Sequence, residues 1–296
     1  MKHQTHLRWM IPAIMLLAAF AAAAGLFWPG GGEPYALVSD RGEAVLIHAR
    51  GLYAWDTVSS AAQMQANDLV TLLLALPLLG LATPLAIRGS LRAHLLLAGT
   101  LGYVLYTYLS MAMLTAFNQL FVVYVALFSL SLFALVLCLL GIDVAGLPAR
   151  FSAGLPRRAI AALLGGTGLF LSVAWLGRIT APWLNGTPPA LEHTTTMVIQ
   201  ALDLGLVMPV VFLGAWLLWQ RRAWGYLLAS VAVMKMLTMG TAVSLMSINM
   251  ALNGVAESPV IAGIFMTLTA INVVLAVWLL RSVDPAPTLN PGALAR

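Results

Sequence analysis

Long, continuous apolar runs constrain this chain more than any other feature of its sequence. Hydrophobic residues fill 61% of the 296 positions and charged residues only 8%, a balance that excludes an ordinary water-soluble domain. The runs do not alternate with polar residues, so they favour membrane-spanning helices over a membrane β-barrel. We therefore predict an all-α, polytopic membrane helix bundle with eight transmembrane helices. The predicted spans are Trp9–Trp28, Ala62–Ile87, His94–Thr115, Leu120–Ile142, Ala159–Leu176, Met197–Trp219, Trp224–Ser247 and Pro259–Leu280.

Lysine and arginine residues in the connecting segments predict the orientation of the bundle. With the N-terminus in the cytoplasm, eleven basic residues lie inside and three lie outside, namely Arg41, Arg50 and Arg178. Cytoplasmic loops carry an excess of basic residues, so this bias predicts a multi-pass inner-membrane protein with both termini cytoplasmic. The net charge of +5 reflects this loop asymmetry and implies no nucleic-acid partner. The single cysteine, Cys138, excludes an intramolecular disulfide.

The longest stretch outside the predicted spans, residues 29–61, is expected to form a small extracytoplasmic cap. Two β-type runs, Tyr35–Ser39 and Val45–His48, flank a five-residue loop that contains glycine, which is the pattern of a β-hairpin. The first apolar segment also has features of a secretory signal peptide, but its length favours a retained helix. Residues 285–296 contain three prolines and are predicted to form a disordered cytoplasmic tail.

A short polar motif recurs between the two halves of the chain at a spacing of 135 positions. The segment Gln65–Leu69 (QANDL) opens the second predicted span, and Gln200–Leu204 (QALDL) opens the sixth. Further matched pairs follow downstream: Pro77 with Pro209, and Asn118 with Asn249. Because the matched spans lie four helices apart, both copies would cross the membrane in the same direction. The pattern predicts two parallel four-helix repeats, residues 1–148 and 149–284.

Three charged side chains are predicted to lie within the membrane, where a charge is costly and tends to mark a functional site. Lys235 lies about twelve residues into the seventh span, roughly 18 Å deep at 1.5 Å per residue, and Asp203 reaches a similar depth in the sixth. We expect these two residues to form an ion pair, with Asp68 at the equivalent depth of the first repeat. Such a group can exchange a proton or a cation. The alternative is a structural pair that locks two helices, with Asp68 capping its helix.

Other polar residues are weaker candidates. Four of them fall on the predicted outer face: His48, Asp56, Glu192 and His193. No metal-binding spacing such as HExxH is present, so we assign no metal ligand. No predicted span carries a central histidine, which argues against haem ligation, and we predict no cofactor. The tyrosines of the third span, Tyr103, Tyr106 and Tyr108, are interpreted as packing or interfacial residues, with cavity lining as the alternative.

Three stretches of the sequence carry a family resemblance. They are Tyr53–Ser60 (YAWDTVSS), Gln65–Val70 (QANDLV) and Asn118–Phe133 (NQLFVVYVALFSLSLF). With these stretches the chain resembles a family of uncharacterised bacterial polytopic integral membrane proteins of similar length, over most of its residues. The resemblance implies the polytopic architecture and brings no activity with it.

Together these features favour a protein that binds or transports a small solute or ion. The site would be a cavity between the two repeats, open toward the outer face, with Asp68, Asp203 and Lys235 as its polar groups. Four further residues would lie at its mouth: Gln65, Gln200, Asn118 and Asn249. One alternative is a membrane-embedded enzyme or accessory protein that acts on a lipid or envelope substrate at the outer leaflet. Another is a sensor or assembly subunit. Membrane lipids are the expected surroundings, and no oligomeric state is assigned.

Overall fold

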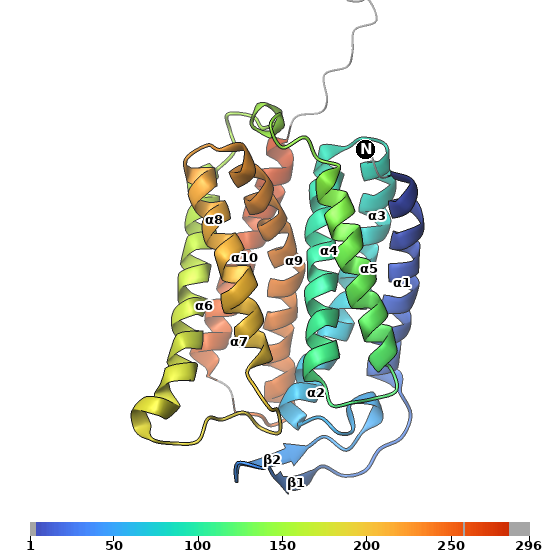
Figure 1. The fold of residues 1–296 in the computed structure, drawn as a ribbon, viewed down its shortest axis with the longest axis vertical. Helices are drawn as coiled ribbons and strands as arrows, with labels where there is room; N and C mark the ends of the chain where they lie inside the picture. Colours follow the sequence, from blue (N-terminus) through green and yellow to red (C-terminus); the bar gives the residue numbers. More distant parts are fainter. Residues whose placement is uncertain (1–3, 257, 284–296) are drawn as a thin grey trace, which may run out of the picture.

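The fold is an all-helical bundle with eight helices that are long and apolar enough to cross a membrane (Figure 1). The computed structural model describes residues 4–256 and 258–283. The protein is thus a multi-pass membrane protein, and the predicted eight spans are confirmed. The spans are α1 (Gln4–Phe27), α2 to α3 (Val58–Ile87), α4 (Leu91–Leu114), α5 (Phe121–Leu140), α6 (Arg157–Asn185), α7 to α8 (Val198–Trp219), α9 (Ala223–Leu252) and α10 (Pro259–Ser282).

Several helices extend beyond the predicted apolar segments, and the ends of α2 and α6 show why. The α2 helix begins at Val58, four residues before the predicted Ala62, because the Thr57 side chain accepts a hydrogen bond from the Ser60 amide at 3.1 Å and caps the helix. The α6 helix continues past the predicted Leu176 and ends at Asn185. Gly186, with a φ of 63°, terminates it in the left-handed conformation that glycine adopts freely. Apolar content therefore predicted the spans, whereas capping residues set the helix ends.

The spans form two groups of four, which we call the first unit (α1 to α5) and the second unit (α6 to α10). In the first unit, α4 packs against α3 and α5, and α1 packs against α2, α3 and α5. The second unit repeats these neighbours, with α9 against α8 and α10, and α6 against α8 and α10. Two clusters of buried hydrophobic residues lie mainly in one unit each, although the first includes Ala242 of α9 and the second includes Leu95 of α4. The two units stand side by side in Figure 1.

The units meet where α9 packs against α4 and α2. The closest approach is at Gly99 of α4, where an added Cβ atom would lie 2.2 Å from the Met234 Cβ and 2.8 Å from the Lys235 amide nitrogen. Only glycine lets the two helix backbones come this near. The contact places Lys235 directly at the seam between the units.

The segment between α1 and α2 contains the predicted β-hairpin. The strands β1 (Tyr35–Val38) and β2 (Ala44–Ile47) pair antiparallel, and β2 buries Val45 and Ile47 while its other residues face outward. A short 3-10 helix, η1 (Gly51–Tyr53), follows. The hairpin lies at the end of the bundle opposite the N-terminus (Figure 1). Its extracytoplasmic position stays a prediction.

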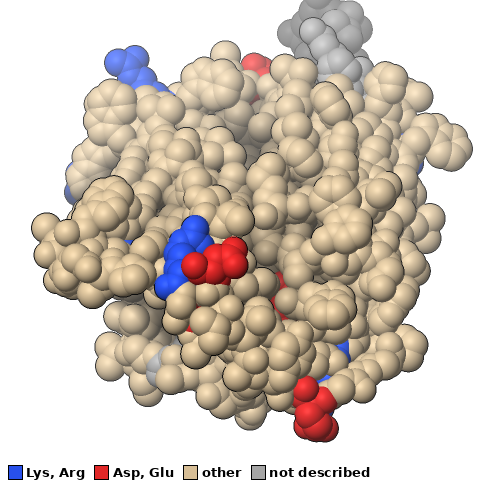
Figure 2. All heavy atoms as spheres, turned by 60° about the horizontal axis from the view of Figure 1, so that its bottom comes forward, with Lys and Arg blue, Asp and Glu red and all other residues tan. Residues whose placement is uncertain are grey.

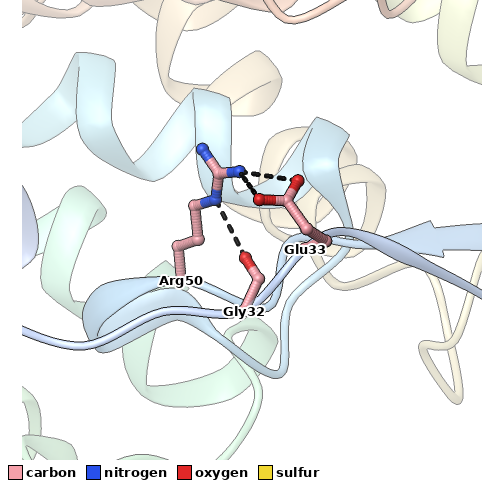
Figure 3. A network of polar contacts seen from close by, with 3 residues as sticks. All are labelled: Gly32, Glu33 and Arg50. Atoms are coloured by element: carbon pink, nitrogen blue, oxygen red, sulfur yellow. Dashed lines mark hydrogen bonds and ion pairs between the residues drawn. The ribbon is translucent and has the colours of Figure 1, made fainter.

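An exposed ion pair closes the base of the hairpin (Figure 3). The Arg50 guanidinium donates to both carboxylate oxygens of Glu33 at 3.0 Å and to the Gly32 carbonyl at 3.0 Å. The loop of the hairpin reaches the second unit, because Arg41 donates to the carbonyls of Thr194 and Thr195 at 3.2 Å. Figure 2 shows this end of the molecule, where charged side chains form small separate patches on a largely uncharged face.

The opposite end holds the described N-terminal and C-terminal residues. The end of α10 is tied to the first unit, since the Arg92 guanidinium donates to the Val283 carbonyl at 2.8 and 2.5 Å. Phe151, which follows the 3-10 helix η3 (Leu147–Arg150), forms an isolated antiparallel bridge with Val283. The predicted tail, residues 285–296, lies outside the described residues.

Candidate functional site

Two of the eight spans are interrupted by a five-residue π-helical turn. The turns are η2 (Thr71–Ala75), between α2 (Val58–Val70) and α3 (Leu76–Ile87), and η4 (Asp203–Val207), between α7 (Val198–Leu202) and α8 (Met208–Trp219). A proline is the second residue of the helix that follows each turn, Pro77 in α3 and Pro209 in α8. Proline cannot donate to the carbonyl four residues earlier and clashes with it, so the helix widens locally. Such turns are frequent at functional sites.

Asp203 is the first residue of η4, and both of its carboxylate oxygens are hydrogen-bonded. The Tyr106 hydroxyl on α4 donates to one oxygen at 2.7 Å, and the Trp175 indole N–H on α6 donates to the other at 2.8 Å. The aspartate is buried, with 8% of its surface exposed. Its partners come from both units, so the carboxylate joins α4 of the first unit to α6 and η4 of the second.

Lys235 of α9 lies against the same tyrosine from the other side. Its Nζ atom is 4.2 Å from the centre of the Tyr106 ring, the geometry of a cation–π interaction. The stem of the lysine crosses α4 at Gly102, where an added Cβ would be 3.8 Å from the Lys235 Cδ. Asp203 attracts the ammonium group electrostatically. The three side chains form one cluster, with Tyr106 between the acid and the base.

The predicted direct ion pair between Asp203 and Lys235 is wrong. Among the described residues, the ion pair found with a nitrogen–oxygen distance within 4 Å joins Arg50 to Glu33 at the surface, and Asp203 and Lys235 do not form one. The physical reason is that tyrosine and tryptophan donors already occupy both oxygens of the Asp203 carboxylate. The lysine is stabilised instead by the face of the Tyr106 ring.

Asp68 lies in a different environment, inside the first unit. It is 1% exposed, and the Tyr53 hydroxyl donates to its carboxylate at 2.6 Å. Gly25 of α1 makes room for this pair, because an added Cβ there would lie 1.9 Å from the Asp68 carboxylate oxygen. The alternative that Asp68 caps its helix is also wrong, since Thr57 caps α2 and Asp68 lies near its other end.

Further tyrosines surround Asp68. The Tyr103 hydroxyl is 3.1 Å from the Thr71 hydroxyl and donates to the Asn67 carbonyl at 3.1 Å. The rings of Tyr108 and Tyr124 stack with centres 6.0 Å apart. All three tyrosine side chains are almost completely buried. The first unit thus holds a carboxyl group among hydroxyl groups, without a lysine or arginine within ion-pair distance in the described part of the chain.

The four residues expected at the mouth of the cavity do not form a single group. Asn249 of α9 joins Gln65 of α2, donating to the Ala62 carbonyl at 2.8 Å and to the Gln65 side chain at 3.4 Å. Asn118 is buried before α5, and its side-chain oxygen accepts from the Leu120 amide at 3.0 Å. Gln200 is buried on α7, one turn before Asp203.

At the hairpin end, polar side chains link the two units. The Thr57 hydroxyl donates to the Glu192 carboxylate, and the Asp56 carboxylate accepts from the Ser60 hydroxyl at 3.0 Å and the Ala116 amide at 3.1 Å. Burial raises the pKa of Asp56 to about 6, despite these hydrogen bonds and the nearby His193. Burial also lowers the pKa of His48. No group of three or more His, Cys, Asp or Glu residues within the described ranges could hold a metal ion.

Two surface hollows lie at the opposite end, away from these polar clusters. One, of about 590 Å³, is lined by Ser152, Gly154 and one face of α10 that includes Trp278 and Arg281. The other, of about 290 Å³, is lined by Leu155–Ala159 and Arg221.

Comparisons of the chain with protein-family models, with curated proteins and with solved structures find no match. Function is therefore inferred from the geometry of the side chains.

Several residues of these clusters were not assigned to a site from the sequence. The sequence favours a packing or interfacial role for Tyr106, with cavity lining as the alternative, and assigns no site role to Trp175, Tyr53 or Tyr124. One signal was available for Tyr106, because residues three apart share a helix face and Tyr103 precedes it by three positions. Trp175 and Tyr53 come from segments far away in sequence, so no local pattern could have assigned them to the aspartates.

Proposed function

We propose that the protein binds and transports a small cation at the seam between its two units. The observation that carries the proposal is the placement of Lys235 over the Tyr106 ring, whose hydroxyl group holds Asp203. An aromatic face beside a carboxylate is a recognised environment for ammonium groups. The Lys235 ammonium group is thus a covalently attached cation in a site whose groups would also bind a free cation. A small ammonium ion that displaces the Lys235 side chain would meet the same two groups.

The architecture supports the proposal, because we infer that the two units are parallel repeats. Three successive elements of the second unit begin 132 residues after their counterparts in the first: η2 at Thr71 and η4 at Asp203, α3 at Leu76 and α8 at Met208, α4 at Leu91 and α9 at Ala223. This spacing differs from the 135 of the sequence motif. It pairs Thr71 with Asp203 and Tyr103 with Lys235. The hydroxyl groups of Thr71 and Tyr103, which contact each other in the first unit, would then correspond to the charged groups of Asp203 and Lys235 in the second.

The proposed orientation follows from the arginines at the two ends of the bundle. The connections at the end that holds the described termini carry Arg88, Arg150, Arg157, Arg158, Arg221 and Arg222. Because basic loops stay in the cytoplasm, we propose that this end is cytoplasmic. The hairpin would then be the extracytoplasmic cap of an inner-membrane protein.

Binding and transport can be tested with tetramethylammonium, a permanent cation that does not cross lipid unaided. Trp175 reports binding, because its indole N–H contacts Asp203. We expect the fluorine NMR signal of 5-fluorotryptophan at position 175, assigned with Trp175→Phe, to shift when tetramethylammonium is added. Vesicles that contain the protein should also take up the radiolabelled cation faster than empty vesicles.

Asp203→Asn should abolish both responses. Asp143→Asn is the matched control, since Asp143 is exposed and, within the described residues, accepts a hydrogen bond from the Gly146 amide of its own loop. This variant should leave both responses unchanged. Lys235→Ala should strengthen binding, because it removes the tethered competitor. An absence of both the fluorine shift and the uptake in the native protein would refute the proposal.

A further inference from the structure

Within the described residues, six buried side-chain polar atoms of the first unit make no hydrogen bond of standard geometry. They are the Asp56 Oδ2, Asn67 Oδ1, Thr107 Oγ1, Ser110 Oγ, Asn118 Nδ2 and Tyr124 hydroxyl atoms. All six side chains are more than nine-tenths buried. Unpaired buried polar groups are rare, and they commonly bind internal water or take part in function. Their concentration in one unit calls for a functional explanation.

Tyr124 stands at the centre of this group. Its ring stacks on Tyr108, and its hydroxyl group interacts electrostatically with both Asp68 and Asp56. Tyr53, which donates to Asp68, also faces Tyr124. Hydroxyl and carboxyl groups therefore follow one another from Asp56 at the hairpin end to Asp68 inside the span.

The same series continues to the seam between the units. Asp68 lies one helical turn before Thr71, whose hydroxyl is 3.1 Å from that of Tyr103. Tyr103 lies one turn before Tyr106 on α4, and Tyr106 holds Asp203. The path thus reaches the acid of the proposed cation site.

We infer that this series of side chains is a proton pathway from the hairpin end through Tyr124 and Asp68 to the Asp203 site. The inference rests on the proposed function, and it names the proton as the ion coupled to cation movement. A hydroxyl group accepts a proton on an oxygen lone pair and releases its own proton to the next oxygen. A carboxylate accepts a proton and then releases it to the next oxygen. One proton enters from water, one leaves at the far end, and no group is oxidised or reduced.

Asp56 suits the entry to this pathway. Its carboxyl group faces the Ser60 hydroxyl of α2, the Ala116 amide before α5, and Glu192 and His193 of the second unit. Its pKa, raised by burial to about 6, lies close to neutral pH. A carboxyl group of this kind both accepts and releases a proton readily.

Proton movement can be measured in vesicles of phosphatidylethanolamine and phosphatidylglycerol that enclose a pH-sensitive dye, with valinomycin and potassium clamping the voltage. After external acidification, with tetramethylammonium present on both sides of the membrane, we expect the native protein to acidify the interior faster than empty vesicles do. Tyr124→Phe keeps the ring and removes the hydroxyl group, and it should slow this rate about tenfold or more. Asp56→Asn should do the same. Tyr226→Phe is the control, because Tyr226 is a buried tyrosine of the second unit.

The outcomes separate the pathway from the cation site. Loss of proton flux in Tyr124→Phe and Asp56→Asn, with tetramethylammonium binding unchanged and a cooperative thermal unfolding transition retained in both variants, supports the pathway. Native proton flux in both variants overturns the pathway while leaving the cation site intact. Proton flux no faster than in empty vesicles also overturns it. Should Asp203→Asn lose neither binding nor flux, the proposed function itself fails.

Discussion

The two units place an aspartate beside a π-helical turn in each case, but they surround it differently. Asp68 of the first unit lies in a closed core, bound by Tyr53 and encircled by further tyrosines. Asp203 of the second unit lies at the seam, where Tyr106, Trp175 and Lys235 approach it from three helices. One environment is built of hydroxyl groups, whereas the other includes a cation.

The comparison teaches that partner choice, and not the acid itself, distinguishes the two sites. Within the membrane a carboxyl group needs polar partners, because hydrocarbon supplies none. The first unit supplies hydroxyl groups from its own helices. In the second unit, one of the hydrogen-bond donors to Asp203 is Tyr106, which belongs to the first unit. Its acid is therefore sensitive to how the units sit against each other, and that is the property expected of a transport site.

The largest effect is expected from filling the space beside Asp68. Gly25→Ala places a methyl group 1.9 Å from the Asp68 carboxylate and 2.7 Å from the Tyr53 hydroxyl. Such crowding costs about 3 kcal/mol or more, so little folded protein should be recovered in detergent. Gly165→Ala is the matched control in α6, since nothing lies within 4 Å of its added Cβ. It should stabilise the protein by up to about 1 kcal/mol. Equal thermal midpoints for the two variants would contradict the tight core.

The next effect is the pH dependence of stability that Asp56 causes at the hairpin end of the first unit. Burial raises the pKa of Asp56 from its usual 3.8 to about 6, so the folded protein holds this proton more strongly than the unfolded chain does. Stability should therefore be greatest below pH 4 and decline as the pH rises to 6, by up to about 3 kcal/mol. The thermal midpoint of the native protein minus that of Asp56→Asn, measured from pH 4 to pH 7, isolates this contribution. A difference that grows with pH in favour of the native protein would contradict the assignment.

A smaller effect compares one tyrosine hydroxyl from each site. Tyr106→Phe removes the 2.7 Å hydrogen bond to Asp203 while keeping the ring under Lys235, and it should cost about 1–2 kcal/mol. Tyr103→Phe removes contacts with uncharged groups, among them the Thr71 hydroxyl and the Asn67 carbonyl. It should cost less than about 1 kcal/mol, because neither partner is charged. Thermal unfolding in detergent tests the order, and a larger loss in Tyr103→Phe would reverse the comparison.

The smallest effect is expected at the exposed pair between Arg50 and Glu33. Side-chain exposures of 52% and 88% leave both charges in water, where such pairs contribute about 1 kcal/mol or less. Glu33→Gln should shift the thermal midpoint by no more than the scatter between preparations. A shift as large as that of Tyr106→Phe would show that the hairpin stabilises the bundle more than its contacts indicate.

Much of the fold could be predicted from the sequence, and less of the site. The eight spans and the hairpin strands follow from local apolar patterns, and the structure contains both. Asp203 and Lys235 were predicted to lie near each other, and one tyrosine indeed joins them. Their direct pairing was wrong, because the Trp175 and Tyr106 donors come from segments 28 and 97 residues away.

The sequence by itself determined which segments enter the membrane and which charged residues they carry. Transfer of a segment into hydrocarbon depends on the sum of its own residues, and that sum can be read without knowing its neighbours. Only the tertiary structure decided the partner of each charge. Partners depend on the rotation of each helix, on the residue that a π-helical turn inserts, and on how closely Gly99 lets α4 approach α9. Each of these is a property of helices in contact, so no single segment specifies it.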